Sequence, residues 1–234
     1  PYIVDLGTQE QKERWLPAMA AGEKICAIAM TEPGGGSDLA ALKTTAVRDG
    51  DHWVLNGSKT FITNGYQADL VIVATRTDPS KGAKGITLFM VEDGMEGFTR
   101  GRKLDKVGQE ESDTAELFFQ DVRVPDSNRI GDEGMGFIAM MQRLPQERVG
   151  AACANVAHAK QILLETIEYA KERKAFGQSI GSFQHNKFKI AELVTAIRAF
   201  IDGWNDRCHP FVWTKAADDI LKKANRKTTS DTRH

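Results

Sequence analysis

The hydrophobic pattern changes its period once along this 234-residue chain. Between residues 24 and 125, short apolar runs alternate with turn dipeptides such as Asp49-Gly50, Asn56-Gly57 and Asn64-Gly65, which predicts strands separated by tight turns. After Gly131 the sequence becomes poor in glycine and takes a helical period. Several strands without helices between them favour an antiparallel barrel or sandwich. We therefore expect an α+β fold, with a central antiparallel β-barrel followed by an incomplete helical bundle.

The expected elements divide the chain into four parts. A capping-box pattern at Thr8 to Gln11 opens a short helix with Trp15, Leu16 and Met19 inward, and Gly22 can end it. The expected strands lie at 53–55, 70–74, 86–91 and 115–119, with an exposed hairpin loop at 77–82, and the expected helices at 136–174 and 183–206. The predicted domains are the end of an N-terminal helical domain (1–23), a β-barrel domain (24–130), a partial C-terminal helical bundle (131–207) and a divergent tail (208–234).

The apolar residues of the last predicted helix form one stripe, which favours packing of helix on helix. Its members are Phe188, Ala191, Val194, Ile197 and Ile201. Beyond Asp206, Pro210 disfavours helix for itself and for His209, so at most a short helix near 214–225 is expected.

Composition excludes several classes of function. A formal net charge of −1 gives no overall attraction to nucleic acid. No apolar run approaches the roughly 20 residues of a membrane span, and no secretory leader is evident. Cys26, Cys153 and Cys208 are far apart, which predicts a reducing compartment and no metal site. The basic cluster of Arg100, Arg102, Lys103 and Lys106 is better explained as a solvated loop or strand than as a phosphate site.

Six segments, taken in order, resemble the acyl-CoA dehydrogenase family. They are MTEPGGGSD (30–38), LNGSKTFITNG (55–65), GRKLDKVG (101–108), DTAELFF (113–119), LPQER (144–148) and ERKAFG (172–177). The resemblance covers roughly residues 1–206 and is to the long-chain type, truncated at both ends. It implies a flavoprotein of fatty-acid or branched-acyl β-oxidation that uses FAD and forms a homotetramer, a dimer of dimers, when full length.

The glycine-rich segment can approach a bulky ligand. Three consecutive glycines at 34–36 remove side chains from the backbone, and the hydroxyl of Ser37 suits a phosphate or pantetheine group. On the residues alone, such a segment is more often only a turn. The resemblance implies that it lies along the flavin, with Ile28, Met30, Thr31 and Ser37 lining the cofactor.

Phe61 and Thr63 are two residues apart, so they share one face of an extended strand. The resemblance implies that the aromatic ring packs on the isoalloxazine and that the hydroxyl hydrogen-bonds it, with Ile62 as a further cofactor contact. Without the resemblance, an aromatic residue and a threonine filling a barrel face would be the simpler interpretation.

Glu147 is the candidate general base. On the residues alone, a Glu-Arg pair in a helix is usually a solvated surface feature. In the long-chain and isovaleryl types of the resembling family, the base comes from this helix, just before an arginine. This implies that Glu147 abstracts the proton α to a thioester carbonyl while hydride passes from the β carbon to the flavin. The implied contacts to acyl-CoA are Ser37, Ala83, Lys84, Pro145, Gln146 and Arg148.

The resemblance also implies partners. Arg173, Phe176 and Gln184 match positions that reach across a dimer interface to the neighbouring subunit's cofactor, although Arg173 could instead satisfy the last carbonyls of a helix. The implied electron acceptor is electron-transferring flavoprotein. The implied location is cytoplasmic in a bacterium or the mitochondrial matrix in a eukaryote.

Three functions remain open on the sequence. The leading one is dehydrogenation of acyl-CoA to trans-2-enoyl-CoA. The others are a non-enzymatic, truncated remnant of the fold and an acyl-CoA oxidase. Retained flavin absorbance would distinguish the dehydrogenase from the remnant, and oxygen consumption with substrate would distinguish it from the oxidase. Ile138 stands where a tyrosine is common in the long-chain type, which leaves the acyl chain open. Because helices of the family lie outside this chain, we expect poor FAD binding and slow or no turnover.

Overall fold

The computed structural model describes residues 1–207, which form two compact units, 1–142 and 143–207. The elements of the first unit are α1 (Tyr2–Leu6), α2 (Gln9–Ala20), β1 (Cys26–Ala29), η1 (Leu39–Ala41), β2 (Thr45–Asp49), β3 (His52–Thr63), β4 (Leu70–Arg76), η2 (Pro79–Gly85), β5 (Ile86–Glu92), β6 (Phe98–Lys103), β7 (Thr114–Pro125), η3 (Asp126–Asn128) and β8 (Arg129–Ile130). Helix α3 (Gly136–Glu172) begins in this unit and continues into the second.

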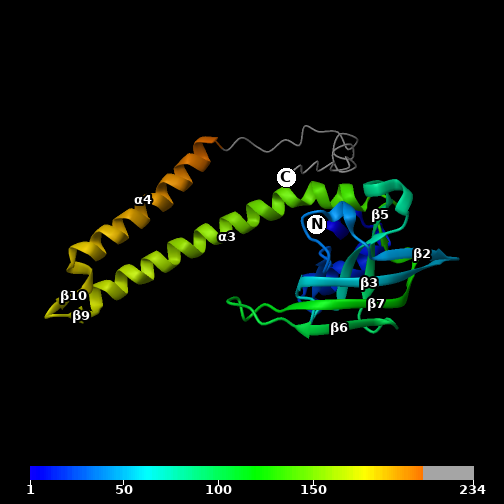
Figure 1. The fold of residues 1–234 in the computed structure, drawn as a ribbon, viewed down its shortest axis with the longest axis horizontal. Helices are drawn as coiled ribbons and strands as arrows, with labels where there is room; N and C mark the ends of the chain where they lie inside the picture. Colours follow the sequence, from blue (N-terminus) through cyan, green and yellow to red (C-terminus); the bar gives the residue numbers. More distant parts are fainter. Residues whose placement is uncertain (208–234) are drawn as a thin grey trace, which may run out of the picture. The chain divides into compact units, whose positions relative to one another are not determined.

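The strands of the first unit form one open sheet in the order β6-β7-β3-β2-β4-β5-β8, with β1 added beside β4 (Figure 1). The end strands pair inward, β6 with β7 and β8 with β5, and no bridge joins them within the described residues. The pairing is also mixed, because β4 runs parallel to both β1 and β2. The expected closed antiparallel barrel is therefore wrong: closure needs backbone hydrogen bonds between the end strands, and β8 is only two residues long.

The central strands β4 and β5 are buried on both faces. Alternate residues of β4 and β5 enter two different cores, so Leu70 and Ile72 lie in one and Val71 and Val73 in the other. The first core is completed by helix residues, among them Trp15 of α2 and Met140 of α3. The second is built from strand residues and loops, which shows that the sheet curls over part of its own face.

Local signals placed α2 correctly. Thr8 caps α2: its hydroxyl accepts from the Gln11 amide at 3.2 Å and its amide donates to the Gln11 side chain at 3.0 Å, which is the predicted capping box. Trp15 is fully buried, and Gly22 follows the helix with a φ of +74°. Within residues 1–207, no helix is long and apolar enough to cross a membrane.

The second unit consists of most of α3, the hairpin β9 (Lys174–Ala175) and β10 (Gln178–Ser179), η4 (Ile180–Ser182) and α4 (Gln184–Arg207). Both helices were predicted to within about two residues. Of the predicted stripe, Val194, Ile197 and Ile201 are half-buried, whereas Phe188 is 57% exposed. A groove of about 320 Å³ between α3 and α4 is lined by Val149, Ala152, Cys153, Val156, Ala157, Lys160, Phe200 and Ile201. The predicted tail and its short helix lie outside the described residues.

Candidate functional site

The glycine-rich segment makes a tight turn with an open outer side. The amide of Glu32 donates to the Gly35 carbonyl and the amide of Gly35 to the Glu32 carbonyl, both at 3.0 Å. A Cβ added to Gly34 or Gly35 would meet no described atom within 4 Å. Ser37, at the end of the turn, is exposed. The chain itself therefore leaves this backbone accessible to a ligand.

Strand β3 carries a bulge where the aromatic candidate lies. Lys59 pairs with Leu117 and Ile62 with Ala115, so β3 has one more residue than β7 between these pairs. Phe61 lies inside the bulge with a φ of +58° and is 68% exposed. Phe61 and Thr63 are both exposed and Ile62 between them is buried, so the predicted shared face is present. The predicted extended backbone at Phe61 is wrong.

Phe61 is a strained position. A bulky residue with positive φ is rare, and such strain costs on the order of 1–3 kcal/mol and persists only where neighbours hold the backbone. Exposure means that the ring recovers little of this cost by burial. On one side, the Thr60 amide donates to the Thr31 carbonyl at 2.9 Å; on the other, the Asn64 amide donates to the Asp113 carbonyl at 3.0 Å. The bulge therefore joins the cofactor candidates of 28–31 to those of 61–63.

A buried ion pair lies at the same junction. Lys59 is fully buried, and its ammonium donates to the Glu32 carboxylate at 2.9 Å and to the Met30 carbonyl at 3.1 Å. Glu32 also accepts from the Lys43 amide, the Thr44 amide and the Thr44 hydroxyl, at 2.6, 2.8 and 2.6 Å. Both residues stand inside the recognised motifs, yet sequence reasoning assigned them no role. The only sequence signal for the pair was that one segment contains an acidic residue and the other a basic residue.

The pKa values of this pair follow from its surroundings. Burial lowers the pKa of Lys59 to about 8, against the opposing attraction of Glu32. Burial alone would raise the pKa of Glu32. The Thr44 hydroxyl, the Lys59 charge and the two backbone amides outweigh that effect and lower it. Glu32 is therefore a carboxylate at neutral pH.

A second carboxylate fixes the end of β3. Asp113 is buried and accepts from the Tyr66 amide and the Gln67 side chain, both at 2.8 Å. Its neighbour Thr114 pairs with Thr63 across the sheet. The turn after Thr63 is thus held by a side chain 50 residues away, a role that its position in the DTAELFF motif alone did not indicate.

Besides Ser37, the acyl-CoA candidates of this unit lie on η2. Lys84 is exposed, but the Ala83 side chain lies in the core, as does that of Ile62. As whole residues, Ala83 is 0% and Ile62 2% exposed, and their contacts to substrate and cofactor stay predictions. The Arg76 guanidinium donates to the carbonyls of Ala40, Leu42 and Gly82 at 2.6, 3.0 and 3.1 Å, which ties η2 to η1.

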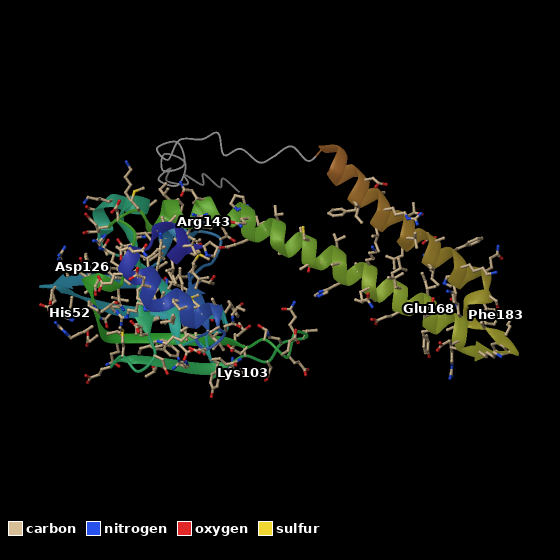
Figure 2. All side chains as sticks on the ribbon, turned by 180° about the vertical axis from the view of Figure 1, so that it is seen from behind. His52, Lys103, Asp126, Arg143, Glu168 and Phe183 are labelled. Atoms are coloured by element: carbon tan, nitrogen blue, oxygen red, sulfur yellow. The ribbon has the colours of Figure 1, made fainter. Side chains whose placement is uncertain are left out.

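The remaining candidates belong to the second unit. Gln146, Glu147 and Arg148 are exposed on α3, and Pro145 is half-buried inside the same helix. Phe176, 96% exposed with a φ of +52°, forms the two-residue turn of the β9–β10 hairpin with Gly177. Its ring lies 6.2 Å from that of Phe183, which Figure 2 labels at this hairpin. Arg173 and Gln184 are exposed beside it.

Two of the four residues of the basic cluster are engaged in the fold. Arg100 is paired with Asp93 at 2.6 Å and lies over the Phe98 ring, and Lys106 donates to the Ser112 carbonyl. Arg102 and Lys103 are exposed. The cluster lies on β6 and the loop after it, as predicted. No group of three or more His, Cys, Asp or Glu side chains that could hold a metal ion occurs within residues 1–207.

Comparisons with known proteins match this arrangement to one family. Residues 27–122 match the sequence model "Acyl-CoA dehydrogenase, middle domain" and residues 134–201 the model "Acyl-CoA dehydrogenase, C-terminal domain". The mouse mitochondrial long-chain specific acyl-CoA dehydrogenase is 51% identical over 207 residues, 86% of this chain and 48% of that protein. The chain thus spans about half the length of this curated relative.

Solved structures show the same relationship. The acyl-CoA dehydrogenase of Geobacillus kaustophilus superposes with a TM-score of 0.83 at 52% identity, covering 88% of this chain and 56% of that one. A structure described as the electron transferring flavoprotein of Acidaminococcus fermentans, from work on flavin-based electron bifurcation, superposes with a TM-score of 0.81 at 44% identity. It covers 85% of this chain and 52% of that chain.

Proposed function

This chain belongs to the acyl-CoA dehydrogenase family, and we propose that it serves the FAD-dependent dehydrogenation of an acyl-CoA thioester to trans-2-enoyl-CoA. The observation that carries the proposal is the exposed, strained Phe61. Strained residues that gain nothing from burial point to a functional constraint. Here the strain lies in the segment whose sequence resembles the flavin contact of the family, beside an open glycine-rich turn.

The residues present fit a flavin. Phe61 offers a flat ring and Thr63 a hydroxyl on one exposed face, and the turn leaves the backbone of Gly34 and Gly35 open. Bound FAD would supply the hydride acceptor of the reaction. In this proposal Ile28, Met30, Thr31, Ser37, Phe61, Ile62 and Thr63 hold FAD from one subunit. Arg173, Phe176 and Gln184 reach the FAD of a second copy.

Glu147 performs the proton transfer in this proposal. Its carboxylate takes the α-proton of the thioester as the bond to the β-hydrogen breaks. Arg148 and Lys84 bring positive charge suited to the phosphates of CoA, and Ser37 brings a hydroxyl. Pro145 and Gln146 line the acyl group, and Ala83 is a further proposed substrate contact. The acyl chain itself is not assigned.

The wider setting is proposed with the activity. The pathway is fatty-acid or branched-acyl oxidation, with electron-transferring flavoprotein as acceptor and a homotetramer as the assembly. The proposed location is cytoplasmic in a bacterium or the mitochondrial matrix in a eukaryote. The division of the chain into four domains stays a prediction. The two compact units of the structure divide between residues 142 and 143.

Flavin retention tests the proposal against its alternatives. A purified chain that is yellow, or that quenches added FAD fluorescence, supports a flavoprotein, and a chain that does neither supports the inactive remnant. Oxygen consumed in proportion to substrate would identify an oxidase. Enoyl-CoA formed with ferricenium but without oxygen uptake supports the dehydrogenase.

Thr63→Val is expected to weaken FAD binding and slow flavin reduction without unfolding the chain. The change removes one hydroxyl at nearly constant volume, and a hydrogen bond of this kind contributes on the order of 1 kcal/mol. FAD titration and stopped-flow reduction measure the effect. Thr99→Val, an exposed threonine of β6 in the same sheet, is the matched control. Equal binding and reduction in parent and Thr63→Val would make Thr63 a sheet residue only.

Phe61→Asn is expected to separate binding from stability. Asparagine tolerates a positive φ far better than phenylalanine, so the free chain should be at least as stable as the parent. FAD affinity should fall, because the ring is lost. Phe118→Asn is the control: Phe118 is also exposed on the sheet but lacks positive φ, so that variant should lose stability. A Phe61→Asn chain that is less stable and binds FAD normally contradicts the assignment.

A further inference from the structure

The candidate flavin surface is assembled from two segments far apart in sequence. One runs from Ile28 through the glycine-rich turn, and the other is the end of β3 around Phe61. Lys59 makes two polar contacts between these segments, one to the Met30 carbonyl and one to the Glu32 carboxylate. Neither side chain is exposed, so neither can itself contact a ligand.

Stability alone does not account for this pair. Removing two charges from water costs several kcal/mol per ion, and apolar replacements of buried pairs are often neutral or stabilising. What the pair does provide is position. Lys59 holds the carbonyl of Met30, while Glu32 holds the amides of Lys43 and Thr44, between η1 and β2.

The hydrogen bonds of Lys59 and Thr60 also constrain the backbone next to the strained Phe61. Lys59 and Thr60 are consecutive, and they bond Met30 and Thr31 in turn, at 3.1 and 2.9 Å. The next residue is Phe61. Because a positive φ at a bulky residue persists only where the surroundings over-determine it, the contacts at 59 and 60 supply part of that requirement.

We propose that Glu32 and Lys59 are a positioning pair, which fixes the glycine-rich turn against the Phe61 bulge and so preorganises the flavin surface. This inference rests on the proposed function. It predicts that the pair matters more for FAD binding than for the stability of the fold.

The test is the double variant Glu32→Gln with Lys59→Met, which removes both charges at similar volume. We expect its urea midpoint to stay close to that of the parent. We expect the FAD dissociation constant, from fluorescence quenching, to rise by about tenfold or more, the equivalent of 1.4 kcal/mol. In the free chain, hydrogen exchange of the Thr44 and Thr60 amides should also accelerate. The control is Asp49→Asn with Arg123→Met, an exposed pair on the same sheet.

The outcomes are distinguishable. If the parent binds no FAD, the proposed function fails and this inference falls with it. If the parent binds FAD and the double variant binds it equally well, only the positioning role is overturned. Should the double variant unfold, Glu32→Asp replaces it, because that variant keeps the charge and withdraws it by one methylene. Unchanged FAD affinity in folded Glu32→Asp also overturns the inference, and weakened affinity supports it.

Discussion

Replacing Glu147 by glutamine should lower acyl-CoA dehydrogenation by several orders of magnitude and leave FAD binding unchanged. The amide has nearly the shape of the carboxylate but cannot take the α-proton. General bases contribute roughly 10²- to 10⁴-fold to rates, and here no other carboxylate of the recognised motif could replace Glu147. Glu147 is exposed on α3, so the substitution should not disturb the core.

Ferricenium-coupled turnover and single-turnover flavin bleaching measure this effect. Glu168→Gln is the matched control, an exposed glutamate of the same helix, labelled in Figure 2. Both variants are measured in this chain and in a full-length family member with the same Pro-Gln-Glu-Arg segment. Turnover near the parent level in Glu147→Gln would show that another group is the base.

Glu32→Ala should destabilise the first unit by about 3–5 kcal/mol, the range found when one partner of a buried pair is removed. The Lys59 ammonium would keep only the Met30 carbonyl as a described partner, and the amides of Lys43 and Thr44 would lose theirs. Urea unfolding of the free chain measures the change. Asp49→Ala breaks an exposed pair on the same sheet and should cost no more than about 1 kcal/mol. A similar small change in Glu32→Ala would contradict the burial argument.

The same variant has a pH dependence with a definite sign. The pKa of Glu32 is lower in the folded chain than its ordinary value of 4.5. At pH values near and below 4.5, Glu32 binds more protons in the unfolded chain than in the folded chain. The stabilisation from Glu32 is therefore complete above pH 4.5 and is lost as pH falls through the folded pKa. The difference in unfolding free energy between parent and Glu32→Ala should therefore shrink below pH 4.5. A difference independent of pH would show that the Glu32 charge contributes nothing.

Sequence reasoning succeeded where the signal is local. The α2 cap, both long helices and the β4–β5 hairpin follow from residues within a few positions of one another. It missed β1, β2, β6 and β8, which are two to six residues long. Segments of that length contain too few alternations of apolar and polar residues to show a period. In β6, charged residues such as Arg100 and Arg102 interrupt the alternation further. The open, mixed sheet depends on which distant edges pair, and so was not predictable from local pattern.

By itself, the sequence determined the family and the identity of the candidate residues, because motif order and residue type are properties of the chain. Tertiary structure alone decided how those residues are presented. It buried the side chains of Ala83 and Ile62, and it forced Phe61 into a strained bulge. It also paired Glu32 with Lys59, 27 residues away. Burial, strain and buried charge arise from contacts between distant segments, so no local pattern contains them.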